Sequence, residues 1–271
     1  MQFRKNKEVV KRNNNLKVQE DNNQKTQEKS KSNSTTHRVQ KLLSNYGYCS
    51  RRKAEVLIEE GRVKVNGKTI SIGDKASKRD NISVDGKHVN KEQKVYIIFN
   101  KPIGCVTALK DDKYKTVIDI IKTKGSGMKN KEINERIFPI GRLDYNTSGL
   151  LLLTNDGDFA NSIMHPRYEI KKTYLAGLYN PINDKQVEEI EDGVELDDGI
   201  TSPSKVRKID EKHIEITIHE GKNRIVRRIL KKLDLNARFL KRIRIGKLLL
   251  SDLKEGRFRM MNEKDKKLIF E

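Results

Sequence analysis

The sequence contains little that would support a disulfide framework, a zinc site or a membrane span. Its 271 residues include only two cysteines, Cys49 and Cys105, and no tryptophan. Two distant cysteines do not make a zinc site, and they indicate a reducing compartment rather than a disulfide-stabilised fold. No apolar run approaches the roughly 20 residues of a bilayer span, and no apolar signal region follows Met1. We therefore expect a soluble, cytoplasmic protein without a membrane partner.

Positive charge is what the sequence has in excess. It contains 58 Lys and Arg against 38 Asp and Glu, a formal net charge of +20. Such a surplus favours a polyanionic partner, because each Lys or Arg docked on a phosphate releases a condensed counterion. The alternative is a lysine-rich proteome, which would raise the charge everywhere. The local clusters described below favour a nucleic acid.

The first 36 residues are rich in Lys, Asn, Gln and Ser and nearly free of large apolar side chains. They carry nine basic and four acidic residues. A segment of this composition cannot bury enough apolar surface to offset the entropy lost on ordering. We interpret residues 1–36 as a disordered basic tail.

Residues 37–92 have the pattern of a small helical module with short strands. Apolar residues recur at helical spacing over 39–46, and a second helix follows the N-cap candidate Ser50 and ends at Gly61. A strand over 63–65 then leads into Asn66-Gly67, a strong hairpin signal. Twelve basic and six acidic residues lie between positions 37 and 88.

The basic residues of this module are placed where phosphates could bind. Arg51, Arg52 and Lys53 occupy a helix start, whose free N–H groups also favour anions. Arg62 and Lys64 point to one face of the next strand and could extend a cationic surface. An ordinary solvated basic face is the alternative interpretation. The expected RNA contacts here are Arg38, Lys41, Arg51, Arg52, Lys53, Arg62 and Lys64.

Residues 93–271 follow a polar linker and alternate irregularly between strands and helices. This pattern predicts an α+β domain with a largely antiparallel or mixed central sheet. Strands are expected at 95–99, 150–154, 174–178 and 214–218, helices around 159–164, 187–190 and 224–233, and a loop at 122–136.

Three stretches of this domain carry side chains suited to chemistry. Asp144 lies in a loop between buried strands, which could present one carboxylate to a ligand, although a loop Asp is more often a turn residue. Lys172 and Tyr174 share one strand face, and a tyrosine ring there could stack on a base or pack in the core.

The third stretch is the most basic part of the chain. Residues 219–247 contain eleven basic and two acidic side chains. An Arg brought from here against Asp144 would keep that carboxylate ionised and aligned. The other cations could hold the RNA backbone or form a solvated helix face. The expected RNA contacts here are Lys222, Arg224, Arg228, Lys241, Arg242 and Arg244.

Taken together, these stretches closely resemble the RsuA/RluB family of ribosomal RNA pseudouridine synthases, and residues 37–92 resemble the S4 RNA-binding domain. The likeness runs from about residue 38 to near the C-terminus. It is carried by Val39–Leu43, Ser50–Ala54, Gly61–Gly67, Lys101–Gly104 with Val106-Thr107, Gly141–Gly157, His165-Pro166, Lys172–Tyr174 and Glu220–Arg228.

The resemblance implies a fold and a set of roles. The fold is an S4 domain followed by a synthase domain whose central mixed sheet is flanked by helices. Asp144 matches the catalytic aspartate, Tyr174 the residue that packs on the target base, and Arg227 the residue that pairs with the aspartate. Arg142 matches the position thought to fill the gap left by the flipped nucleotide. Ile225 stands where Gln is usual, which puts one polar contact in doubt.

The implied reaction is the isomerisation of uridine to pseudouridine, which needs no cofactor and no metal. The Asp144 stretch and the 165–170 stretch look most like the branch that acts on large-subunit ribosomal RNA, with the small-subunit branch as the alternative. We expect a monomer. A non-catalytic RNA-binding or ribosome-assembly factor would explain the S4-like part alone. An S4-containing methyltransferase would need a Gly-rich turn after a strand, and none is found.

Overall fold

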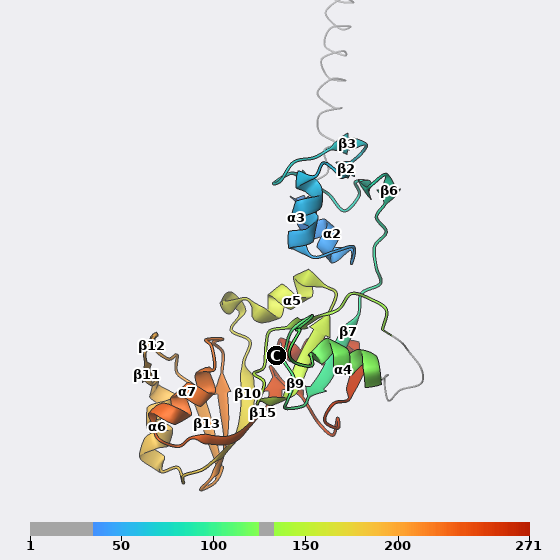
Figure 1. Cartoon of the computed structure of the whole chain (residues 1–271). Coiled ribbons are helices and arrows are strands. Elements are labelled where there is room, and N and C mark those ends of the chain that lie inside the picture. The colour runs from blue at the N-terminus through green and yellow to red at the C-terminus, as the bar shows by residue number, and fades with distance from the viewer. Residues whose placement is uncertain (1–34, 125–132) are drawn as a thin grey trace, which may run out of the picture. The chain divides into compact units, whose positions relative to one another are not determined.

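The computed structural model describes residues 35–124 and 133–271 (Figure 1). Almost all of the expected tail at 1–36, and the middle of the expected loop at 122–136, lie outside the described residues. The chain divides into two compact units, one with residues up to Leu43 and Cys49–Val89, the other with Ser44–Tyr48 and Asn90–Glu271. The domain boundary expected between residues 92 and 93 stays a prediction.

The smaller unit contains the two predicted helices, α2 (Val39–Asn45) and α3 (Arg51–Glu59). Ser50 caps α3, because its Oγ accepts a hydrogen bond of 3.1 Å from the backbone N–H of Lys53. The predicted hairpin is also confirmed: Asn66 and Gly67 have φ of 51° and 81°, as a tight turn between right-twisted strands requires. The strands are β1 (His37–Arg38), β2 (Val63–Val65), β3 (Lys68–Thr69), β4 (Lys75–Ala76), β5 (Ile82–Val84) and β6 (Lys87–His88).

The larger unit is built on a nine-stranded sheet in the order β13-β14-β10-β15-β9-β7-β17, with β8 and β16 paired beside β9 and β15. Only β15 and β9 pair in parallel; the other ladders are antiparallel. This confirms the α+β fold with a mixed sheet. The strands are β7 (Tyr96–Lys101), β8 (Phe138–Ile140), β9 (Ser148–Thr154), β10 (Lys172–Leu178), β13 (Lys205–Asp210), β14 (His213–Ile218), β15 (Ala237–Ile245), β16 (Leu248–Leu249) and β17 (Phe258–Met260), and a separate hairpin joins β11 (Glu195–Leu196) to β12 (Gly199–Ile200).

Helices cover different parts of this sheet and divide the core into clusters. Helices α6 and α7 pack on β10 and β14, α4 packs on β7 and β9, and α5 and α8 pack on the opposite face of β9 from α4. Figure 1 shows α4 beside β7 and β9. Tyr174 packs against the cluster formed by α6, α7, β10 and β14 and also against the cluster formed by α4, β7 and β9. It therefore lies where these two clusters meet. The helices are α4 (Val117–Lys124), α5 (Gly157–Met164), α6 (Asp184–Asp192), α7 (Ile225–Lys232) and α8 (Glu263–Ile269), with a 3-10 turn η2 (Pro166–Tyr168).

Two elements near the centre of the sheet were not predicted from the sequence. The nine-residue strand β15 lies between β10 and β9, and α4 occupies residues before and inside the expected loop at 122–136. Across residues 35–124 and 133–271, no helix has the length and apolar composition needed to cross a membrane.

Candidate active site

The loop that carries Asp144 is held from below by a buried lysine. It joins β8 to β9, and Lys101, at the end of β7, is fully buried beneath it. Lys101 Nζ donates hydrogen bonds to the carbonyl oxygens of Asp144 and Thr147, both at 3.0 Å. Thr107 Oγ1 donates to the carbonyl oxygen of Leu143 at 2.7 Å. These contacts fix the backbone on both sides of the carboxylate.

Lys101 is therefore a structural cation rather than a surface one. A third hydrogen bond, to the carbonyl oxygen of Pro102 at 2.9 Å, gives all three ammonium protons an acceptor. Burial lowers the pKa of Lys101, while the nearby charge of Asp144 acts in the opposite direction. Sequence reasoning gave Lys101 no role. The available signals were its place in the Lys101–Gly104 stretch, which contributes to the resemblance, and its position at the end of a mostly apolar strand.

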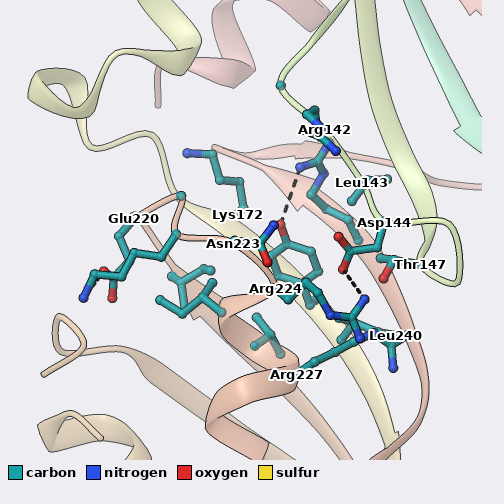
Figure 2. Close-up of a pocket in the computed structure, with 18 of the residues that line it drawn as sticks. Arg142, Leu143, Asp144, Thr147, Lys172, Glu220, Asn223, Arg224, Arg227 and Leu240 are labelled. Carbon is teal, nitrogen blue, oxygen red and sulfur yellow. Dashed lines mark hydrogen bonds and ion pairs between the residues drawn. The ribbon is translucent and has the colours of Figure 1, made fainter. Parts of the chain in front are cut away.

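The carboxylate of Asp144 faces an arginine, but a different one from that expected. Arg224 Nη1 lies 3.5 Å from Asp144 Oδ2 (Figure 2). Arg227 instead donates to the carbonyl oxygens of Asn146, at 2.7 Å, and Ala237, at 3.5 Å. The ion pair of the described structure is thus formed by Arg224, and Arg227 supports the backbone of the same loop.

The difference arises from where the helix begins. The expected helix started at Arg224, but α7 starts at Ile225, and Arg224 precedes it in the left-handed conformation with φ of 49°. Its side chain therefore does not follow the helical spacing. Burial and the charge of Arg224 lower the pKa of Arg227, and Asp144 acts in the opposite direction.

A cavity of about 490 Å³ brings the three sequence stretches together. Asp144, Tyr174 and Arg227 all line it, and so does the exposed side chain of Arg142. Figure 2 shows Asp144 and Arg224 on one side of the cavity and Lys172 on another. Its remaining walls include the apolar residues Ile140, Leu143, Ile163, Met164, Ile218, Ile225, Val226, Leu240 and Ile245.

Arg242 is not the surface phosphate contact that was expected. Only 4% of it is exposed, and it lines the cavity from β15. Its Nε donates to the carbonyl oxygen of Leu150 at 2.7 Å and its Nη1 to the hydroxyl of Tyr174 at 3.5 Å. Because β15 is a central strand, alternate residues point inward, and Arg242 is one of them.

Lys172 lines the same cavity, half-buried on β10. Its Nζ donates to the carbonyl oxygen of His219 at 3.3 Å. Burial, together with the charge of Arg242, lowers the pKa of Lys172 to about 8. The sequence placed Lys172 beside Tyr174 but gave it no function.

Several other expected RNA contacts are engaged within the protein. Arg62 forms ion pairs with Asp85 and Glu60, at 2.6 and 2.8 Å. The structure also pairs Lys222 with Glu220 and Arg228 with Asp198. The expected contacts with exposed side chains are Arg38, Arg51, Arg52, Lys53 and Lys64, and those with partly buried side chains are Lys41, Lys241 and Arg244.

No ligand set for a metal is found in the described residues. Among residues 35–124 and 133–271, no three His, Cys, Asp or Glu side chains are grouped so that they could hold a metal ion. The polar groups of the cavity instead include two carboxylates, Asp144 paired with Arg224 and Glu220 paired with Lys222, together with a tyrosine and further cations. Such a set can bind an uncharged base and its phosphates and can supply a carboxylate to a sugar.

Comparison with known proteins gives this arrangement a family. The family model described as RNA pseudouridylate synthase matches residues 95–232, and the S4 domain model matches residues 37–82. A ribosomal large subunit pseudouridine synthase B from Bacillus subtilis (strain 168) is 45% identical, covering 81% of this chain and 89% of that protein. An uncharacterised RNA pseudouridine synthase from Aquifex aeolicus (strain VF5) is 44% identical, covering 83% and 90%.

A solved structure agrees with these matches. A crystal structure described as pseudouridylate synthase superimposes with a TM-score of 0.62 at 28% identity, covering 86% of this chain and 99% of that one. The sequence relatives, the two family models and the shared fold all point to one enzyme class. The chain belongs to the RsuA/RluB family of pseudouridine synthases and is an isomerase with an N-terminal S4 domain.

Proposed function

We propose that this enzyme isomerises a specific uridine in large-subunit ribosomal RNA, with Asp144 as its catalytic carboxylate. The observation that carries the proposal is the cavity in which Asp144, paired with Arg224 at 3.5 Å, shares a wall with Tyr174. The large-subunit substrate is supported by the 45% identical relative from Bacillus subtilis, whose name includes that subunit.

The reaction requires the uridine to leave the base stack, because its glycosidic bond and C5 edge are inaccessible within a helix. Tyr174 packs against the extruded uracil, and Arg142, exposed beside the cavity, fills the space that the nucleotide leaves. Arg227, which holds the carbonyl oxygen of Asn146, keeps the Asp144 loop in place. Arg224 forms an ion pair with the carboxylate of Asp144 and orients it.

Asp144 acts on the ribose in one of two ways. It attacks C1′ as a nucleophile, or it removes the proton from C2′ as a base. In both cases the bond between N1 and C1′ breaks, the uracil turns within the cavity, and its C5 bonds to C1′. The reaction moves no group to another molecule, and no step draws on a cofactor or metal.

The two units divide the work. We propose that residues 37–92 bind the RNA and residues 93–271 carry out the isomerisation, in a monomer that acts in the cytoplasm. The exposed residues Arg51, Arg52 and Lys53 at the start of α3 are the strongest candidates for phosphate contacts in the first unit.

Pseudouridine mapping tests the substrate. Ribosomal RNA from cells with and without the gene is compared nucleotide by nucleotide, and the purified enzyme is then added to the RNA from the deletion strain. We expect one or a few large-subunit sites to be lost and then restored. A site lost only from small-subunit RNA would replace the proposed substrate, and no lost site in either would contradict it.

The role of Asp144 is tested in the same assay with Asp144→Asn. This change keeps the size of the side chain and removes the charge, so we expect no detectable turnover and RNA affinity within about threefold of the original. Asp156→Asn, at the N-cap of α5, is the matched control and should keep full turnover. Comparable turnover in Asp144→Asn would remove this residue from the mechanism.

A further inference from the structure

The cavity is lined by a buried arginine, Arg242, whose hydrogen-bonding capacity is only partly used. Arg242 Nη2 is buried and has no hydrogen-bond partner among the described residues. Its Nη1 reaches only the Tyr174 hydroxyl, at 3.5 Å, and its Nε is bound to the carbonyl oxygen of Leu150. A buried guanidinium N–H without an acceptor is costly, so such a group in a cavity wall indicates a missing ligand oxygen.

A second cation lies close to the first. Lys172 lines the same cavity, and neither Lys172 nor Arg242 forms an ion pair within residues 35–124 and 133–271. Burial, and then the charge of Arg242, lower the pKa of Lys172 to about 8, because both disfavour the charged form of its ammonium group. Two partly desolvated like charges favour a site that receives negative charge.

The position of this pair relates it to the base rather than to the RNA backbone. The guanidinium carbon of Arg242 lies 6.0 Å from the centre of the Tyr174 ring, near its hydroxyl end. A phosphodiester continues into nucleotides on both sides and must stay near the surface, whereas Arg242 is only 4% exposed. A flipped uracil has free carbonyl oxygens at its far edge and can reach this depth.

The reaction supplies the charge that these cations would meet. When the bond between N1 and C1′ breaks, its electron pair stays on N1 and is delocalised over O2 and O4 of the uracil. The bond between C5 and C1′ then forms, the proton on C5 leaves, and N1 gains a proton. The base therefore carries negative charge only while it is detached, and donors placed in advance at its oxygens stabilise that state most.

We propose that Lys172 and Arg242 form a cationic end of the cavity, which binds a carbonyl oxygen of the extruded uracil and stabilises the detached base as an anion. This inference rests on the proposed role of the cavity as the uridine site. Figure 2 shows Lys172 separated from Asp144 and Arg224. Different charged groups therefore contact the sugar and the base. The carboxylate acts at the ribose, and the cations act at the leaving base.

The test uses the full chain and a short RNA that contains the mapped target uridine, made with either uridine or 5-fluorouridine at that position. Fluorine withdraws electrons and makes the uracil a better leaving group, so it relieves an enzyme that has lost charge stabilisation. Single-turnover consumption of the target nucleoside is measured by mass spectrometry, and the dissociation constant of the RNA by filter binding. Conversion of the uridine RNA by the unmodified enzyme tests the proposed function separately.

We expect Arg242→Met to slow consumption of uridine by about 100-fold, with RNA affinity changed by less than about threefold. With 5-fluorouridine the loss should shrink to about tenfold or less. Arg238→Met is the matched control, because it removes one exposed charge near the start of the same strand, outside the cavity. Its rate should be unchanged with both RNAs.

Two results would overturn the proposal. An equal loss with uridine and 5-fluorouridine would show that the cations do not act on the leaving base. A loss found entirely in RNA affinity, and absent when a methylphosphonate replaces a phosphate next to the target, would make the pair a phosphate site. If Arg242→Met does not fold, Lys172→Met, at a half-buried position, decides by the same two criteria.

Discussion

At the scale of single residues, the most consequential side chain outside the reaction itself is Lys101. Its ammonium group donates to the carbonyl oxygen of Asp144, as does the backbone N–H of Thr147, and it spans the loop to the carbonyl oxygen of Thr147. The position of the carboxylate therefore depends on a cation that never meets the RNA. A displacement of about 1 Å at a catalytic group can lower a rate by about 100-fold.

Lys101→Met tests this dependence. The change removes a donor from three carbonyl groups and leaves that of Thr147 without its described donor, so we expect a loss of roughly 1–3 kcal/mol in the free energy of unfolding and about 100-fold in turnover. RNA affinity should change little. Urea unfolding, single-turnover rates and filter binding measure the three quantities. The exposed Lys254→Met makes the same chemical change as a control, and equal turnover in the two variants would contradict the role of Lys101.

Lys172 predicts a dependence of stability on pH. Its pKa is about 8 in the folded protein and 10.5 in an unperturbed lysine, so between these values the unfolded chain binds more protons than the folded one. The cost of burying the ammonium group is fully present below pH 8 and disappears as the pH rises through 10.5. Lys172→Met should therefore be more stable than the original at pH 7, with a smaller difference at pH 10.

Urea unfolding at the two pH values measures this difference. A variant that loses activity and gains stability would show that Lys172 is kept for function at a cost to the fold. A Lys172→Met protein less stable than the original at pH 7 would contradict the prediction. The half-exposed Lys241→Met, on the neighbouring strand, is the control for the removal of a lysine from the sheet.

At the scale of elements, the close approach of β9 and β15 holds in place the strand that carries Arg242. Gly149 pairs with Arg242 in the only parallel ladder of the sheet. It has φ of +106°, and a Cβ there would lie 2.2 Å from the carbonyl oxygen of Arg242. Only glycine allows the two backbones to meet at this point.

Gly149→Ala should therefore destabilise the protein strongly. Backbone strain and the clash with Arg242 together should cost roughly 3 kcal/mol or more in the free energy of unfolding. Gly199→Ala, in the hairpin of β11 and β12, is the control, because Gly199 also has a positive φ but open space around its Cα. It should cost only about 1 kcal/mol. Equal losses would mean that the clash with Arg242 is relieved by movement of the strands.

Strand β15 also shows where sequence reasoning stopped. Period-two burial, capping by Ser50 and the Asn66-Gly67 turn are local signals, and the elements they predicted were found. In Ala237–Ile245, by contrast, Lys241, Arg242 and Arg244 alternate with apolar residues, and the composition was interpreted as surface charge. Whether Arg242 points to solvent or inward depends on which strands flank β15, and that is a non-local fact.

In the candidate site, too, one part could be predicted from the sequence and another part could not. The grouping of Asp144, Tyr174 and Arg227 around one cavity followed from the resemblance of their motifs to a known family. The identity of the arginine that pairs with Asp144 did not, because it depends on the left-handed backbone of Arg224 just before α7. The resemblance assigned this role to Arg227, because a match between motifs does not contain the backbone conformation of a neighbouring residue.

At the scale of the whole molecule, the net charge of +20 raises the question of which cations carry RNA affinity. Some basic residues are occupied in ion pairs, such as Arg62 and Arg228, and some are buried, such as Lys101 and Arg242. Total charge alone would make every remaining cation equivalent. A defined docking surface would make the exposed start of α3 more important than other exposed cations.

Two charge-matched double variants distinguish these views. Arg51→Ala with Arg52→Ala removes two exposed cations from α3, and Lys264→Ala with Lys267→Ala removes two from α8. If the start of α3 contacts two phosphates, the first pair should lower the slope of log affinity against log salt by about 1 to 2, and the second pair should leave it unchanged. Filter binding from 50 to 300 mM salt measures the slopes.

The rate of isomerisation of bound RNA is a second measurement on the same variants. At saturating enzyme, the first pair should isomerise bound RNA at the original rate, because α3 carries no side chain that lines the cavity. Equal slopes for the two double variants would mean that affinity follows net charge alone, and the first unit would lose its assigned role. A slower bound-state rate in the α3 variant would instead mean that docking of the first unit sets the position of the uridine, and the two units would have to be treated as one catalytic assembly.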